Sequence, residues 1–208
     1  MMIESIIFDM DGTLWDSAEN VAAAWNKAVA GLSERRFSGD DIRGVMGLTM
    51  DAIAARFFPD ASEQMRMEIL TRCCDIENDY LREHGGGIYP DTAATTARLA
   101  KRFRLFIVSN CQAGYIEAFL DHYGLWEHIT DRLCWGDNGL QKSENIRLIM
   151  QKNNVEPSRA LYVGDTQTDR DSARAAGVKF AFASYGFGSV DGFDFKLNSL
   201  SELCEILK

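Results

Sequence analysis

Acidic, hydroxyl and amine side chains follow several short apolar runs of this sequence. Asp9-Met10-Asp11-Gly12-Thr13 follows the first run, and Ser109-Asn110 follows another. Lys142 comes shortly after a third run, and Gly164-Asp165-Thr166 with Asp169 comes after a fourth. If these runs are parallel strands, the polar residues collect beyond their carboxyl ends, where open parallel sheets bind ligands. The spacing therefore predicts one polar site.

Four carboxylates at one sheet edge repel one another unless a cation or protons neutralise them. Oxygen-only ligands suit Mg²⁺, which usually takes few carboxylates and keeps positions for water and phosphate. We therefore expect Mg²⁺ as the cofactor, with Asp9, Asp11, Asp165 and Asp169 as the candidate metal-site residues. The compact positive charge of Lys142 suits a phosphoryl group.

A carboxylate beside a metal-held phosphate can act as a covalent nucleophile. Asp9 and Asp11 are two residues apart, and strand periodicity places them on the same side of the chain. One can attack phosphorus while the other handles the proton of the leaving group. Ser109 and nearby backbone amides can donate hydrogen bonds to the phosphoryl oxygens. Gly12 allows the sharp turn that this geometry needs.

The elements that must position these residues alternate along the chain. Short apolar segments predict strands, and amphipathic stretches between them predict helices. The expected strands cover 3–8, 104–108, 129–135, 160–163 and 178–183; the expected helices cover 92–101, 113–123, 143–153, 168–176 and 199–207, with Asp91 and Ser143 as N-caps. This alternation predicts an α/β fold with a Rossmann-like parallel sheet.

Residues 16–87 have a different character from the rest of the chain. Three stretches with helical spacing fill this region, which ends at Gly85-Gly86-Gly87, and no convincing strand occurs in it. We therefore expect an α/β core formed by 1–15 and 88–208, with an all-helical cap, 16–87, inserted after the first strand. In the cap, Arg43 lies near Gly44 and Gly47 between two helical stretches. Arg43 is the best cap candidate for binding a substrate anion, although a surface role is equally consistent with the sequence.

These motifs, in this order, resemble the haloacid dehalogenase-like hydrolase superfamily, and within it the phosphoglycolate-phosphatase-like members with a helical C1-type cap. The resemblance implies that Asp9 forms an aspartyl-phosphate and that Asp11 is the general acid/base, with its backbone carbonyl on Mg²⁺. It further implies phosphoryl binding by Ser109 and Asn110, neutralisation by Lys142, metal ligation by Asp165, and a ligand or supporting role for Asp169. Lys142 is followed by Ser143-Glu144, where many relatives have proline.

Several reactions of this superfamily can be compared with the sequence. The second aspartate, Asp11, disfavours a dehalogenase, and a phosphonatase needs a Schiff-base lysine where the cap offers only Lys27, at a position that looks exposed. A sugar phosphomutase of the β-phosphoglucomutase type carries a cap histidine where this chain has Val21. Hydrolysis of a small phosphorylated metabolite, phosphoglycolate-like or a sugar phosphate, is therefore our first interpretation. A phosphomutase and a non-enzymatic interaction module that retains the fold remain as alternatives.

Composition limits the classes of partner and the compartment. The 208 residues contain 22 Lys and Arg against 31 Asp and Glu, which gives a formal charge of −9 and no basic footprint for nucleic acid or anionic membranes. The five cysteines include no C-x-x-C pair, which favours reduced thiols. The N-terminus resembles no signal peptide. We therefore expect a cytoplasmic monomer whose partner is a small phosphorylated metabolite.

Overall fold

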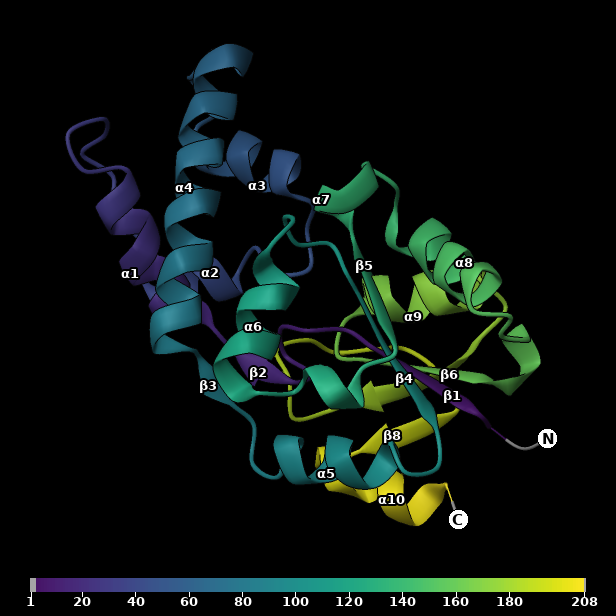
Figure 1. The fold of residues 1–208 in the computed structure, drawn as a ribbon. Coiled ribbons are helices and arrows are strands. Elements are labelled where there is room, and N and C mark those ends of the chain that lie inside the picture. Colours follow the sequence, from purple (N-terminus) through teal and green to yellow (C-terminus); the bar gives the residue numbers. More distant parts are fainter. Residues whose placement is uncertain (1–2, 208) are drawn as a thin grey trace.

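The computed structural model describes residues 3–207, and a six-stranded sheet lies at its centre (Figure 1). The strand order is β5-β4-β1-β6-β7-β8, and every neighbouring pair is parallel. The strands are β1 (Ser5–Phe8), β4 (Arg104–Ser109), β5 (Asp131–Cys134), β6 (Ala160–Gly164), β7 (Lys179–Ala183) and β8 (Phe195–Leu197). The predicted α/β fold with a Rossmann-like parallel sheet is confirmed.

Helices cover both faces of the sheet because side chains of each strand alternate between two apolar clusters. Ile6 and Phe8 of β1 belong to the larger cluster, whereas Ile7 between them belongs to the smaller one. The larger cluster includes residues of α5 (Thr92–Leu99), α6 (Tyr115–Tyr123) and α10 (Leu203–Ile206); the smaller one includes residues of α8 (Lys142–Lys152) and α9 (Gln167–Ala175). Among residues 3–207, no helix is both long and apolar enough to cross a bilayer.

Four helices follow β1 in the sequence and stand to one side of the sheet (Figure 1). They are α1 (Ala18–Ala28), α2 (Gly39–Arg43), α3 (Met50–Phe57) and α4 (Glu63–His84). The chain leaves and re-enters the core through β2 (Trp15–Asp16) and β3 (Gly87–Ile88), which pair antiparallel. We propose that this two-stranded stem separates the cap, 16–87, from the core. The stem is too short to produce a sequence pattern, so the sequence did not reveal it.

The ends of several helices differ from the sequence-based predictions. Asp91 precedes α5, but its backbone is left-handed (φ 61°) and its side chain makes no capping hydrogen bond. Ser143 is not an N-cap, because α8 begins at Lys142 and Gln141 occupies the cap position. The predicted C-terminal helix divides into a 3-10 turn (Leu200–Glu202) and α10. The predicted strand 129–135 is shorter because α7 (Trp135–Asn138) begins at its end.

Candidate active site

Three carboxylates and one ammonium group meet where β1, β6, α8 and α9 end or begin. Asp9 directly follows β1, and its backbone N–H donates to Val163 of β6 at 2.9 Å. Carboxylate oxygens of Asp9, Asp165 and Asp169 lie within 4.8 Å of one another. The Nζ of Lys142 lies 3.0 Å from Oδ1 of Asp9 and 2.6 Å from Oδ1 of Asp169. The fold therefore gathers four of the predicted site residues into one buried cluster.

Asp169 is held by donors from its own neighbourhood. Its Oδ2 accepts hydrogen bonds from the backbone N–H of Asp165 at 3.2 Å and from the N–H and Oγ1 of Thr166 at 3.0 and 2.7 Å. Its Oδ1 accepts from Lys142. Both oxygens are thus engaged by protein donors, which hold the Asp169 carboxylate between Lys142 and the loop after β6.

The buried cluster contains three carboxyl groups and only one ammonium group. Burial, and then the charge of Asp169, raise the pKa of Asp9 to about 7 and that of Asp165 to about 8. Burial disfavours the charge on Lys142, but Asp169 and Asp9 outweigh it and raise the pKa of Lys142 above its ordinary value. Oδ1 of Asp165 is buried and has no hydrogen-bond partner. This oxygen-only donor set fits a hard divalent cation.

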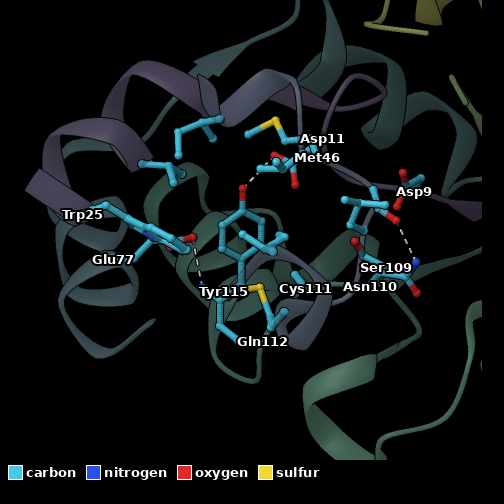
Figure 2. A pocket seen from close by; sticks show the side chains of 17 residues that line it. Asp9, Asp11, Trp25, Met46, Glu77, Ser109, Asn110, Cys111, Gln112 and Tyr115 are labelled. Carbon is cyan, nitrogen blue, oxygen red and sulfur yellow. Dashed lines mark hydrogen bonds between the residues drawn. The ribbon is translucent and has the colours of Figure 1, made fainter. Parts of the chain in front are cut away.

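Asp11 lies outside this cluster and has different partners (Figure 2). Its Oδ1 accepts hydrogen bonds from the Ser17 hydroxyl at 2.9 Å and from the Tyr115 hydroxyl at 2.6 Å. Burial raises the pKa of Asp11 to about 6, and these two hydrogen bonds limit the increase. Because both donors engage Oδ1, Oδ2 is the oxygen available to carry a proton. The sequence did not identify Ser17 or Tyr115, whose positions depend on the packing of α1 and α6.

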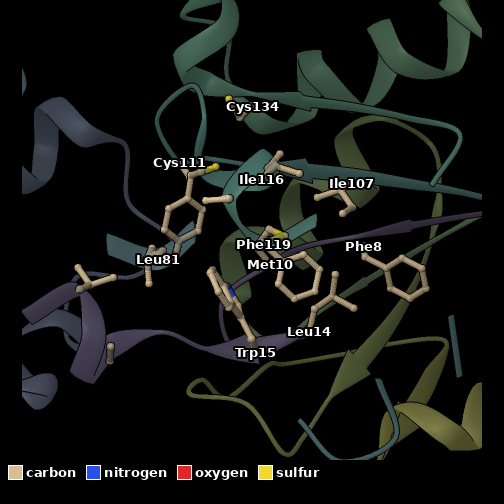
Figure 3. Close-up of a cluster of buried hydrophobic side chains, with 14 of the residues drawn as sticks. Phe8, Met10, Leu14, Trp15, Leu81, Ile107, Cys111, Ile116, Phe119 and Cys134 are labelled. Carbon is tan, nitrogen blue, oxygen red and sulfur yellow. The ribbon is translucent and has the colours of Figure 1, made fainter. Parts of the chain in front are cut away.

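An aromatic cluster fixes the chain that carries Asp11 (Figure 3). Trp15 is fully buried and makes edge contacts with Tyr115 and Phe119, with ring centroids 5.4 and 5.0 Å apart. Met10 and Leu14 are buried in the same cluster. The residues on either side of Asp11 are therefore anchored in the core, which limits its movement.

The backbone at Gly12 brings this loop against Asp165. Gly12 has a φ of +78°, and a Cβ at this position would overlap the carboxylate of Asp165. Gly139 has a similar φ of +71° but has open space around it. We expect Gly12→Ala and Gly139→Ala each to lower the free energy of unfolding by about 1 kcal/mol or more, because alanine is strained in the left-handed region. Gly12→Ala should lower it by about a further 1–3 kcal/mol, because the added methyl group overpacks the site. Thermal unfolding of the two variants measures the difference; equal losses would contradict the close approach of Gly12 to Asp165.

The other two predicted phosphoryl-binding residues also face this region. Ser109 ends β4, and Ser109 and Asn110 line a cavity together with Asp9 and Asp11 (Figure 2). Nδ2 of Asn110 donates to the carbonyl of Gly47 in the cap at 2.9 Å. Asn110 is therefore also a contact between core and cap.

Arg43 is not among the residues that line the cavity. Its guanidinium is engaged by three carboxylates, at 3.0 Å from Asp16, 3.2 Å from Glu19 and 2.9 Å from Asp40. The structure therefore does not bring Arg43 to the other candidate site residues. Its sequence neighbours did not reveal this, because the three acids come from the stem, α1 and α2.

The cavity lies between core and cap and has a volume of about 50 Å³. A single buried water molecule needs about 10–15 Å³, so the space holds only a few water molecules or small chemical groups. Glu77 of α4 lines it on the cap side. The sequence did not identify Glu77, because a charged residue within a long amphipathic helix is typical of a solvated position.

Burial raises the pKa of Glu77 to about 7 from its ordinary value of 4.5, and hydrogen bonds from Trp25 and Gln112 limit the increase. The folded protein thus binds this proton more tightly than the unfolded chain does. The associated stability is complete below pH 4.5 and is lost as the pH rises through 7. We expect the free energy of unfolding of the wild type, relative to Glu77→Gln, to fall by about 3 kcal/mol between pH 4 and pH 8. Urea titrations measure it; a difference independent of pH would contradict the burial of this carboxyl.

Comparison with known proteins shows the family of this chain. The family model described as haloacid dehalogenase-like hydrolase matches residues 6–183, which include every candidate site residue named above. The chain belongs to the haloacid dehalogenase-like hydrolase family. The family model and the curated relatives of this chain together place it among the enzymes that hydrolyse phosphoric monoesters.

Curated relatives of this hydrolase align over most of its length. The phosphoglycolate phosphatase of Vibrio parahaemolyticus is 28% identical, with 99% of this chain and 96% of the relative aligned. The phosphoglycolate phosphatase of Rhodospirillum rubrum is 31% identical, with 89% of this chain and 81% of the relative aligned. The predicted membership of the phosphoglycolate-phosphatase-like subgroup is confirmed.

Solved structures show the same fold. A haloacid dehalogenase-like family protein of Streptococcus pneumoniae superimposes with a TM-score of 0.81 at 20% identity, covering 99% of each chain. A mutant of CbbY from Rhodobacter sphaeroides, solved with xylulose-1,5-bisphosphate, superimposes with a TM-score of 0.79 at 23% identity, covering 97% of this chain and 96% of that one.

Proposed function

We propose that this hydrolase is a Mg²⁺-dependent phosphatase that cleaves a small phosphorylated metabolite through an aspartyl-phosphate on Asp9. The observation that carries the proposal is the ion pairing of buried Lys142 with both Asp9 and Asp169 beside the unpartnered oxygen of Asp165. This arrangement keeps a potential nucleophile next to a fixed positive charge. It also leaves one carboxylate oxygen available for a cation.

The first step places the substrate phosphorus against the Asp9 carboxylate. An Asp9 oxygen attacks phosphorus, the bond from phosphorus to the leaving oxygen breaks, and Asp11 gives its proton to that oxygen. A pKa of about 6 keeps Asp11 close to the balance between acid and base that such transfers need. Hydrogen bonds from Ser17 and Tyr115 to its other oxygen hold the carboxyl in place.

The second step reverses the role of Asp11. As a carboxylate it takes a proton from a water molecule, whose oxygen attacks phosphorus. The bond between phosphorus and Asp9 breaks, and inorganic phosphate leaves. Lys142, at 3.0 Å from Asp9, stabilises negative charge in both steps.

Asp9, Asp165 and the backbone carbonyl of Asp11 are the groups that we assign to Mg²⁺, with Asp169 in support through Lys142 and the loop after β6. When bound, Mg²⁺ supplies charge neutralisation between these carboxylates and the substrate phosphoryl group. Ser109 and Asn110, which line the cavity with Asp9, are the assigned phosphoryl-binding residues. Arg43 has no assigned role in this proposal.

The cap supports hydrolysis rather than phosphoryl transfer between sugars. Val21, at the position where the β-phosphoglucomutase type carries histidine, is 4% exposed and lines the cavity with an apolar side chain. An apolar residue cannot move a proton to or from a substrate hydroxyl. Cap closure over the cavity would exclude bulk water and select the substrate.

Phosphate release from a panel of small phosphomonoesters tests the proposal directly. We expect turnover with Mg²⁺ and none after treatment with EDTA, with activity restored when Mg²⁺ is returned. A mutase would instead show isomerisation that depends on a bisphosphate and exceeds hydrolysis. Failure to release phosphate from any ester in a broad panel would overturn the proposal.

Metal binding should also stabilise the protein, because the cation relieves repulsion among buried carboxylates. We expect saturating Mg²⁺ to raise the melting temperature of the wild type and to have little effect on Asp165→Asn, which lacks the available carboxylate oxygen. At a hundredfold excess over Kd, the gain is about 2.7 kcal/mol. Differential scanning fluorimetry with Mg²⁺ and with Na⁺ at equal ionic strength measures it. Equal shifts in the two proteins would contradict the assignment of Asp165.

A further inference from the structure

Glu77 is a buried carboxylate at the cap end of the cavity, and the mechanism above does not use it. Its side chain is 3% exposed. Oε1 accepts a hydrogen bond from Nε2 of Gln112 at 2.9 Å, and Oε2 accepts one from the indole N–H of Trp25. Figure 2 shows Glu77 and Trp25 on the other side of Tyr115 from Asp9. The two donors fix the carboxylate at the end of the cavity remote from the nucleophile.

The charges around the cavity are all of one sign. The 17 lining residues include Asp9, Asp11 and Glu77 but no lysine, arginine or histidine. Lys142 is engaged by Asp9 and Asp169, and Arg43 is engaged by three carboxylates outside the cavity. Above pH 7, where Glu77 is ionised, an anionic group on the leaving side of the substrate would therefore meet a carboxylate and no compensating cation.

The remaining walls on the cap side are mainly apolar. Val21, Ile42, Val45, Met50 and Ile53 line the cavity beside Glu77. A polar group of the substrate that enters this region loses water, and a buried polar group without a partner is costly. Glu77 is the cap side chain that can accept its hydrogen bond, since each carboxylate oxygen has capacity for more than one donor.

We propose that Glu77 is a specificity-determining residue that accepts a hydrogen bond from the leaving group of the substrate. The substrate class is then a small phosphate monoester whose leaving group carries a hydroxyl or ammonium donor and no second anion. Phosphoglycolate, whose leaving group is a carboxylate, belongs to the disfavoured class. This inference rests on the proposed phosphatase function, and it separates this chain from relatives that are named for phosphoglycolate.

A matched pair of substrates tests it. In 2-hydroxyethyl phosphate, a CH₂OH group replaces the carboxylate of 2-phosphoglycolate, so the two differ at the group that would face Glu77. With Mg²⁺ present at pH 8, where Glu77 is ionised, we expect the wild type to give a kcat/KM at least tenfold higher for 2-hydroxyethyl phosphate. Phosphoethanolamine carries an ammonium group in the same place and distinguishes the two kinds of donor. Turnover comparable to that of 2-hydroxyethyl phosphate would include ammonium donors in the substrate class. Poor turnover would restrict the substrate class to hydroxyl donors.

Substitution of the carboxylate should reduce the discrimination. We expect Glu77→Gln to lower the preference for 2-hydroxyethyl phosphate over phosphoglycolate by at least fivefold, mainly through KM for phosphoglycolate. Glu83→Gln, on the same helix with a side chain that is 77% exposed, is the control and should keep the wild-type ratio. A wild-type preference for phosphoglycolate, or an unchanged ratio in a folded Glu77→Gln, would overturn the inference.

A second variant keeps the test decisive if Glu77→Gln does not fold. Met46 is a half-buried cap residue that lines the same cavity, so Met46→Lys adds the cation that the lining lacks. We expect this variant to increase kcat/KM for phosphoglycolate relative to 2-hydroxyethyl phosphate by at least fivefold; an unchanged ratio would count against the charge argument.

If 4-nitrophenyl phosphate, 2-hydroxyethyl phosphate and phosphoglycolate all release no phosphate, the phosphatase proposal itself fails and this inference fails with it. Turnover of 4-nitrophenyl phosphate with no preference between the matched pair overturns the inference alone.

Discussion

Lys142→Met is expected to destabilise the protein by about 3–5 kcal/mol and to reduce kcat/KM by a thousandfold or more. Lys142 is 2% exposed, and its ammonium group is ion-paired with both Asp9 and Asp169. Removing one partner of a buried ion pair leaves the other charges uncompensated, which accounts for the loss of stability. The loss of activity follows because the nucleophile and the transferred phosphoryl group lose their fixed positive charge.

Lys152→Met is the matched control for this variant. Lys152 lies on the same helix, with a side chain that is 59% exposed, and pairs with Asp131 at 2.9 Å. Exposed pairs contribute about 1 kcal/mol or less, so this control should stay close to the wild type in both stability and activity. Urea titration and phosphate release measure the two effects separately. Similar losses in the two variants would contradict the assigned role of Lys142.

Asp9→Asn is expected to reduce kcat by at least about 10⁴-fold, because removal of a covalent nucleophile leaves only binding and electrostatic contributions. The fold should survive. Burial and Asp169 raise the pKa of Asp9 to about 7, so its ionised form is costly in the folded protein without metal. A neutral amide of the same shape removes that cost above pH 7. We therefore expect metal-free Asp9→Asn to be at least as stable as the wild type at pH 8.

Asp171→Asn, on α9, is the control for Asp9→Asn. Its carboxylate is 58% exposed and pairs with Arg170 on the surface, so activity and stability should change little. Activity retained by Asp9→Asn within tenfold of the wild type would contradict a nucleophilic role. An unfolded Asp9→Asn would contradict the electrostatic description of the cluster.

Residues placed by strand periodicity could be predicted from the sequence. Asp9 and Asp165 each follow the end of a short apolar strand and Ser109 is the last residue of one, and parallel pairing brings such ends to one edge. Lys142 could be placed near that edge by its position after β5, although the exact start of α8 could not. For these residues, the strand pattern in the sequence and the parallel order of the sheet both predict the same position at the site.

Residues whose environment depends on packing between distant segments could not be predicted. The hydrogen bonds that engage both oxygens of Asp169 depend on the loop after β6, and the partners of Arg43 come from three separate segments. Glu77 is buried only because α4 packs against α1 and meets Gln112 of the core. These contacts have no periodic signature in the sequence.

The central claim is that turnover passes through a phosphoryl group bound covalently to Asp9. Rapid acid quench during turnover with Mg²⁺, followed by peptide mapping by mass spectrometry, tests it most directly. The account predicts one added phosphoryl group on the peptide that contains Asp9, its disappearance when substrate is exhausted, and no modification in Asp9→Asn. Phosphate release at the wild-type rate with no modified peptide at any quench time, or a phosphoryl group on a different residue, would contradict it.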